Sequence, residues 1–125
     1  MRLAYSAPEA DRSVAADILR YTLPATKALP FVKLRDNDQP FWRPESFWRV
    51  EPTGNRNNDL RLGRRYARLA IAAMKADRDS QLLACIIQDI MRDVAGGTGK
   101  QGRAKPSPVA LGFLAEISET IAAVR

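Results

Sequence analysis

Five cationic side chains recur at helical spacing in the middle of the chain, and their types and order suit the binding of anions. They lie in the segment 58–78, which reads NDLRLGRRYARLAIAAMKADR. Wound at about 100° per residue, this segment places all five on one arc that no acidic residue interrupts. The five are Arg61, Arg64, Arg65, Arg68 and Lys75. Guanidinium forks repeated along one line suit the phosphates of a nucleic-acid backbone.

The positive charge of the chain is concentrated in the same region. The formal net charge is +6, and residues 54–78 carry seven basic and two acidic side chains. A local excess of this kind indicates an anionic partner, either nucleic acid or an acidic protein surface. The simpler interpretation is a solvated helix face, neutralised in part by carboxylates of neighbouring helices. Those carboxylates would be Asp89 and Asp93, or Glu116 and Glu119.

No helix-turn-helix pattern accompanies the basic helix. The turn at residues 76–80 contains no glycine, and the helix predicted after it is apolar and slightly acidic, unlike a recognition helix. If nucleic acid is the partner, we therefore expect contacts to its backbone and not to its base edges.

The side chains on which most catalytic sites depend are missing from this sequence. It has no histidine and one cysteine, Cys85, which excludes Ser-His-Asp and Cys-His sites, His-liganded zinc and thiolate clusters. Asp89 and Asp93 lie one helical turn apart, and we interpret them as solvent-facing charges. The run GGTGK fails as a phosphate loop because Gln101 follows its lysine. We predict no catalytic residue, no metal and no cofactor, and a protein that is not an enzyme.

Hydrophobic periodicity predicts an all-α fold around the basic helix. We expect four helices in a single domain, residues 1–125, in an orthogonal or bundle-like arrangement. The first is predicted from about residue 7 to 21, with Ser6 as its cap and Pro24 at its end. The second is the basic helix. On that helix the side opposite the basic arc has Leu62, Tyr66, Leu69 and Ala73, and a flank of mostly small residues has Gly63, Ala67, Ala70 and Met74.

Two further helices complete the prediction. The third begins after Asp77 or Asp79 and stops at Gly96, and the fourth has Ser107 as N-cap and Pro108 as its first residue. The third helix has an apolar stripe over half its circumference, so we expect it to be the most buried element. That stripe consists of Leu82, Leu83, Ile86, Ile87, Ile90, Met91 and Val94. The stripe of the fourth helix consists of Val109, Phe113, Leu114, Ile117, Ile121 and Val124.

The segment 22–57 is irregular and contains six of the eight prolines. Within it, two tandem hexads, PFWRPE and SFWRVE, hold both tryptophans of the chain. We favour an aromatic loop that folds over the helices and fills their core, with a weak β-hairpin between 31–35 and 46–51. The alternative is an exposed loop that stacks on bases or anchors a partner protein. Its residues would be Phe41, Trp42, Arg43, Phe47, Trp48 and Arg49.

Our first expectation is a non-enzymatic binding module that is dimeric. We expect it in the cytoplasm, because no secretory signal, no apolar run long enough to span a membrane and no disulfide framework are visible. One alternative is an assembly protein that dimerises through the third-helix face bearing Cys85. That thiol projects away from the apolar stripe, so we expect its side to pack against the loop or a second subunit. Another alternative is a ligand pocket under the tryptophan loop, lined by Arg43, Arg49 and Tyr66.

Overall fold

The computed structural model describes residues 23–35, 44–96 and 105–124 of the chain. The described residues form helices and irregular connections, as the sequence predicts. The helices are α2 (Pro24–Lys27), α3 (Arg56–Asp77), α4 (Leu82–Gly96) and α5 (Pro108–Ala123). The first predicted helix, residues 7–21, lies outside the described residues.

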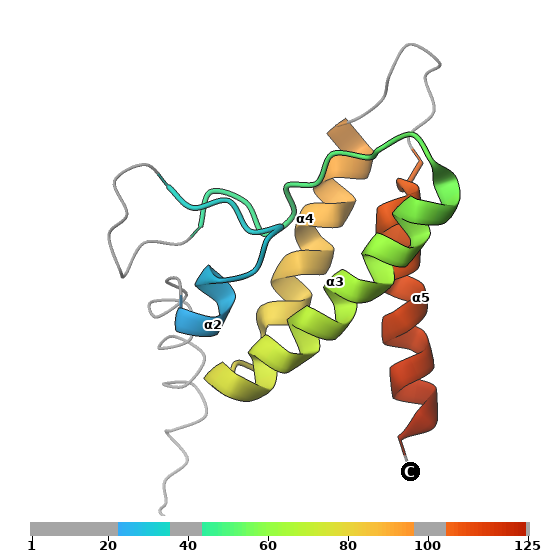
Figure 1. Ribbon diagram of the computed structural model, residues 1–125. Helices are drawn as coiled ribbons and strands as arrows, with labels where there is room; N and C mark the ends of the chain where they lie inside the picture. Colours follow the sequence, from blue (N-terminus) through green and yellow to red (C-terminus); the bar gives the residue numbers. More distant parts are fainter. Residues whose placement is uncertain (1–22, 36–43, 97–104, 125) are drawn as a thin grey trace, which may run out of the picture.

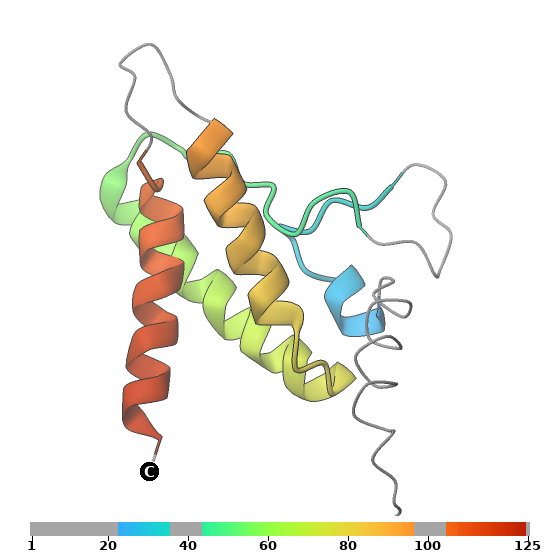
Figure 2. The ribbon, with the colours of Figure 1, turned by 180° about the vertical axis from the view of Figure 1, so that it is seen from behind.

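Helix α3 crosses the front of the molecule and organises the rest (Figure 1). Helices α3 and α5 both run from the top of that view to the bottom, come together near their starts and diverge below, while α4 runs the opposite way behind them. The view from behind shows α4 and α5 side by side (Figure 2). The short α2 lies on the other side of α4 from α5, and the segment that leads to α3 starts there and crosses the end of α4 to reach the start of α3 beside α5. One cluster of buried apolar side chains joins these parts.

The sequence that precedes α3 determines where the helix begins. The Asn55 side chain accepts a hydrogen bond from the backbone N–H of Asn58 at 3.0 Å and thereby caps the helix. The helix therefore begins at Arg56, slightly earlier than the sequence predicts. At its other end Arg78 adopts a left-handed conformation with φ 51°, which terminates the helix.

Asp59, in the first turn of α3, is almost fully buried and holds the connection before the helix. The Thr53 hydroxyl donates to Oδ1 of Asp59 at 2.8 Å, and the Thr53 backbone N–H donates to the same oxygen at 3.1 Å. These two hydrogen bonds, the hydroxyl first, lower the pKa of Asp59 from its ordinary value of 3.8, although burial opposes them.

The lowered pKa of Asp59 predicts a loss of stability in acid. The carboxylate stabilises the fold fully above the unfolded-state pKa, close to 3.8, and this contribution disappears as the pH falls through the lower folded-state pKa. We expect Asp59→Asn to lower the melting temperature near neutral pH, and to lower it progressively less as the pH falls below about 4. Thermal unfolding followed by circular dichroism across this range measures the difference, and a difference that stays constant would contradict the assignment.

The flank of small residues supplies most of the buried residues of α3, while the side directly opposite the basic arc is buried at Ala73 and only in part elsewhere. Gly63, Ala67 and Ala70 are buried, whereas Leu69 remains 37% exposed. The reason is the close approach of α5. A Cβ atom at Gly63 would overlap the Val109 carbonyl oxygen and lie 2.7 Å from the Phe113 backbone nitrogen.

The same close approach restricts α5. A Cβ atom at Gly112 would overlap the Leu60 carbonyl oxygen and lie 2.9 Å from the carbonyl carbon of Leu60. At this point the two backbones touch each other, and only glycine leaves room for the contact. The α3–α5 crossing therefore requires glycine at positions 63 and 112.

The irregular segment before α3 contains a single helical turn, α2, that the sequence analysis does not predict. Asp77, the last residue of α3, accepts hydrogen bonds from the backbone N–H groups of Ala25 and Thr26 at 3.1 and 3.0 Å. These bonds satisfy free donors at the start of α2 and fix it to the end of α3. Asp77 therefore caps α2 and not α4.

The predicted β-hairpin between 31–35 and 46–51 is reduced to one antiparallel bridge, which pairs Lys33 with Ser46. A further backbone hydrogen bond joins Arg49 N–H to the Phe31 carbonyl at 2.8 Å. The described residues therefore contain no named strand.

The second aromatic hexad fills the core, as the structural interpretation predicts. Trp48 packs with Phe31, Tyr66 and Phe113 at ring-centroid distances of 5.5, 6.3 and 5.2 Å, and Phe47 is buried as well. Tilted and edge-on arrangements such as these are the favoured geometries of aromatic pairs. The corresponding residues of the first hexad, Phe41, Trp42 and Arg43, lie outside the described residues.

Helix α4 is not the most buried element, and that expectation is wrong. Its inner residues Leu82, Ile86 and Ile90 are buried, but Met91 on the predicted stripe is 65% exposed. Helix α5 has the larger buried set, because it packs closely against α3. That set is Val109, Ala110, Gly112, Phe113 and Ile117.

Candidate polyanion-binding surface on α3

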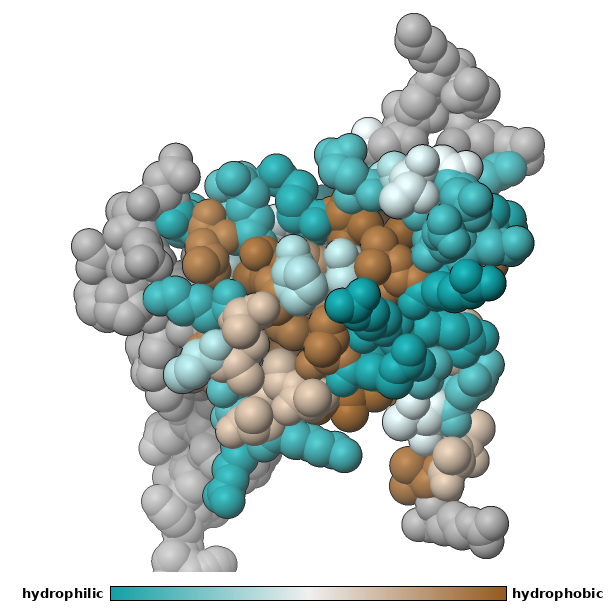
Figure 3. Space-filling model, viewed as in Figure 1, coloured by the Kyte–Doolittle hydropathy of each residue, from teal (hydrophilic) through white to brown (hydrophobic). Residues whose placement is uncertain are grey.

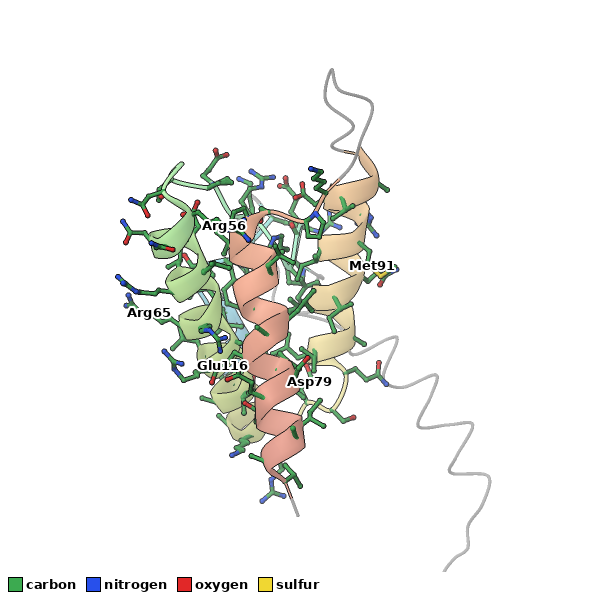
Figure 4. The ribbon with its side chains drawn as sticks, turned by 90° about the vertical axis from the view of Figure 1, so that its right-hand side faces the viewer. Arg56, Arg65, Asp79, Met91 and Glu116 are labelled. Carbon is green, nitrogen blue, oxygen red and sulfur yellow. The ribbon has the colours of Figure 1, made fainter. Side chains whose placement is uncertain are left out.

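The predicted basic residues lie on the side of α3 that faces away from the core. Arg61, Arg65 and Lys75 are exposed, and the space-filling view shows hydrophilic side chains gathered over the first half of α3 (Figure 3). Arg65 points outward from α3, away from α4 and α5 (Figure 4). The regular helix from Arg56 to Asp77 therefore presents these cations to solvent from one rigid element.

Arg64 has a different role, because two carboxylates of α5 engage it. Its guanidinium contacts Glu116 at 3.1 Å and Glu119 at 3.0 Å. The hydrogen bond with Glu119 raises the pKa of Arg64 most, and the hydrogen bond with Glu116 raises it further. In turn, the hydrogen bond with Arg64 lowers the pKa of Glu119. Arg64 thus joins α3 to α5 where the two helices diverge, and it contributes little free charge to a partner.

Arg68 is both exposed and in contact with a carboxylate. One of its nitrogens is 3.4 Å from Glu116, but its side chain is 60% exposed and the carboxylate is shared with Arg64. A long contact of this kind at the surface stabilises by about 1 kcal/mol at most. Arg68 can therefore turn to an external anion at small cost.

We call the exposed members of the five predicted cations, Arg61, Arg65, Arg68 and Lys75, the α3 ridge. Five predicted cations face two carboxylates, Glu116 and Glu119, so the surface keeps an excess of three positive charges. Of the carboxylates considered from sequence as neutralising partners, those of α5 take this role. Asp89 does not, since it binds the loop.

Asp89 is mostly buried, which corrects its interpretation as a solvent-facing charge. It accepts a hydrogen bond from the Phe47 backbone N–H at 2.7 Å and contacts Arg92 at 3.2 Å. Asp93, one turn further on, is exposed as predicted. The carboxylate of Asp89 therefore fixes the aromatic loop to α4.

The aromatic loop contributes little apolar surface where the structure describes it. Phe47 and Trp48 are buried, and Arg49 is exposed with Glu45 at 3.2 Å. Arg49 and Trp48 border a recess of ≈ 410 Å³, whereas Tyr66 belongs to the aromatic cluster. The residues predicted to line one pocket thus do not come together, and Arg43 lies outside the described residues.

Cys85 lies on the side of α4 that faces the loop, as expected. It is half-buried and borders a polar recess of ≈ 250 Å³. The recess is lined by Arg35, Pro44, Glu45, Phe47, Cys85, Gln88, Asp89 and Arg92. The loop of the same chain therefore covers the Cys85 face in part, and a dimer contact there is not required to bury it.

Sequence reasoning missed Arg56, which is exposed at the first position of α3. It lies near the start of α5 in Figure 4, apart from the outward-pointing Arg65. The signal that could have identified it is the Asn55 cap, which places Arg56 at the positive end of the helix dipole. Asn57 and Asn58 are exposed beside it, whereas the side chain of Asn55 is occupied by the cap.

Comparisons of the chain with protein-family models, with curated proteins and with solved structures find no match. Among residues 23–35, 44–96 and 105–124, no helix has the length and apolar character needed to cross a membrane. Within the same residues no group of His, Cys, Asp and Glu side chains has the composition of a metal site.

Proposed function

We propose that this protein is a non-enzymatic binding module that engages a polyanion through the α3 ridge. The observation that supports this most directly is the separation of the basic residues into two sets. Arg64 is engaged by Glu116 and Glu119, whereas Arg61, Arg65 and Lys75 are exposed and have no ion pair within the described part of the chain. Because these three cations form no ion pair with α5, we infer that they bind a partner instead of stabilising the fold.

The backbone of a nucleic acid is the polyanion that the ridge fits best. At 1.5 Å per residue, Arg61 and Arg68 lie about 10 Å apart along the helix axis. Over the same length of a duplex axis, one DNA strand has about three phosphates. Arg61, Arg65 and Arg68 offer three guanidinium groups across the same distance, and each group can bind a phosphate in a bidentate manner. Such contacts carry no base specificity.

An acidic protein surface is the second candidate, because an apolar groove borders the ridge. The groove lies between α2 and α3 and has a volume of ≈ 300 Å³. Ala72 lines it and follows Arg68 by four residues, so the two share a helix face. An acidic peptide with apolar side chains could contact both features. The full lining is Ala25, Ala28, Leu29, Pro30, Leu69, Ala72, Ala73 and Ala76.

We also propose that the protein acts as a homodimer in the cytoplasm. The Cys85 face is a poor choice for the contact, since the loop of the same chain partly covers it. The dimer that we propose therefore uses a different apolar surface.

A double charge reversal tests the ridge. We expect Arg61→Glu with Arg65→Glu to weaken binding of a labelled DNA duplex about tenfold or more at low salt, because two phosphate contacts become repulsive. Both side chains are exposed, so the fold should be retained. Fluorescence anisotropy measures the affinity, and circular dichroism checks the helix content.

The matched control is Arg49→Glu with Arg92→Glu, which changes the net charge equally on the loop and α4. We expect this control to retain most of the affinity. Equal weakening by both double variants would show that net charge, and not the α3 ridge, determines binding. Binding of an acidic peptide but not of DNA would favour the second candidate.

A further inference from the structure

Within residues 23–35, 44–96 and 105–124, helices α4 and α5, which Figure 2 shows side by side, leave several apolar side chains exposed. On α4, Ala84, Ile87 and Met91 recur at helical spacing beside the buried stripe, and on α5 a similar row runs along the helix. Met91 is 65% exposed and Ile121 is 63% exposed. We call these residues the α4–α5 face: Ala84, Ile87, Met91, Leu111, Leu114, Ser118 and Ile121.

Among the residues that the structure describes, those of α4 and α5 that carry a charge are engaged elsewhere or lie at one end, so this face has no charged member. Glu116 and Glu119, the charged residues of α5, contact Arg64 of α3. On α4, Asp89 binds the loop and Arg92 contacts Asp89. Asp93 lies near the C-terminal end of α4. A helix that is apolar on nearly all sides, as α5 is, is usually covered on all sides.

We infer that the α4–α5 face is the contact surface for a second copy of this chain. In a two-fold dimer one patch meets itself, so a patch of one charge sign would repel its copy. The α3 ridge would suffer this repulsion, whereas the uncharged α4–α5 face would not. Pairing two helices from each copy would also give a four-helix contact, a common way for apolar helix faces to be buried.

The position of this face relative to the ridge has a functional consequence, which rests on the proposed binding of nucleic acid. Met91 points out from α4 on the side opposite to that on which Arg65 points out from α3 (Figure 4). A dimer formed through the α4–α5 face therefore carries its two ridges on opposite outer sides. Such a dimer would hold two separate nucleic-acid segments and bridge them, instead of binding one segment twice.

The oligomeric state tests the contact surface independently of nucleic acid. We expect the unaltered protein to sediment at twice the chain mass of 13.9 kDa. Met91→Lys with Ile121→Lys should sediment at the single chain mass with unchanged helix content, because both side chains are exposed in one copy. Leu69→Lys adds a lysine at an exposed site on α3 and should leave the dimer intact.

A sedimentation result of a single chain mass for the unaltered protein at high concentration would overturn this inference, as would a dimer that survives the paired lysine variant. A second experiment measures bridging, as the capture of a second, differently labelled duplex on an immobilised one.

The unaltered protein should capture the second duplex, and the paired lysine variant should bind the first duplex without capturing the second. Arg61→Glu with Arg65→Glu should stay dimeric while losing affinity, which separates failure of the ridge from failure of the dimer. Capture by the monomeric variant would overturn the bridging role.

Discussion

Replacement of Gly63 or Gly112 by alanine is expected to destabilise the fold by about 3 kcal/mol or more. At Gly63 the added methyl group would meet the backbone of Val109 and Phe113, and at Gly112 it would meet the backbone of Leu60. Backbone atoms cannot rotate away as the end of a side chain can, so α5 must shift from α3. Alanine favours the helix over glycine by at most about 1 kcal/mol, which is too little to compensate.

Gly96 provides the control for this prediction, because a Cβ atom there would meet nothing within 4 Å. We expect Gly96→Ala to change the free energy of unfolding by no more than about 0.5 kcal/mol. Urea unfolding followed by circular dichroism measures all three variants. If Gly63→Ala and Gly112→Ala unfold at the same urea concentration as Gly96→Ala, the close contact of α3 and α5 is absent.

Phe113→Ala should lower the free energy of unfolding by about 4 kcal/mol, through lost burial and the cavity that remains. Phe113 is fully buried, and its ring lies 5.2 Å from Trp48 and 6.1 Å from Phe31. The substitution removes the one aromatic side chain through which α5 joins this cluster.

The signal of Trp48 provides a second readout. Because Trp48 contacts Phe113, its fluorescence should change in Phe113→Ala before any unfolding. Val124, just after α5, is 72% exposed. Val124→Ala should therefore change the free energy of unfolding by no more than about 0.5 kcal/mol. A loss below about 1 kcal/mol for Phe113→Ala would mean that α5 does not close the aromatic core.

The sequence predicts the ends of the helices well where the signal is local. Ser107 caps α5, since its side chain accepts from the Ala110 backbone N–H at 3.2 Å, and Pro108 is the first helical residue. Helix α4 ends at Gly96, as the paired glycines indicate. Capping residues and prolines act within one turn of the chain, so their effect does not depend on tertiary packing.

The choice of buried faces could not be predicted in the same way. Periodicity separates apolar from polar sides, but it does not reveal that α5 approaches Gly63 closely enough to bury a strip of small residues. The same limitation applies to Asp89, because helical spacing alone cannot show that Phe47 would donate a hydrogen bond to it. Both outcomes depend on contacts between segments far apart in sequence.

The exposure of most of the basic residues could be predicted from the sequence, but the ion pairs that they form could not. Helical spacing places Arg61, Arg65 and Lys75 correctly on the solvent side. Helical spacing cannot show that Arg64, unlike Arg61 and Arg65, is held in ion pairs. Those pairs are formed with Glu116 and Glu119, some fifty residues away in the chain. Carboxylates on α5 were considered as partners from the sequence, and only the packing of α5 on α3 decides which arginine they engage.

The salt dependence of DNA binding tests the central claim most directly. If Arg61, Arg65 and Arg68 each neutralise one phosphate of a duplex, the logarithm of the binding constant should fall with the logarithm of salt concentration with a slope near −2.7. The affinity should then drop about 40-fold between about 50 and 200 mM salt. A slope near zero, or a slope that Arg61→Glu with Arg65→Glu leaves unchanged, would contradict the assignment of the α3 ridge as the polyanion-binding surface.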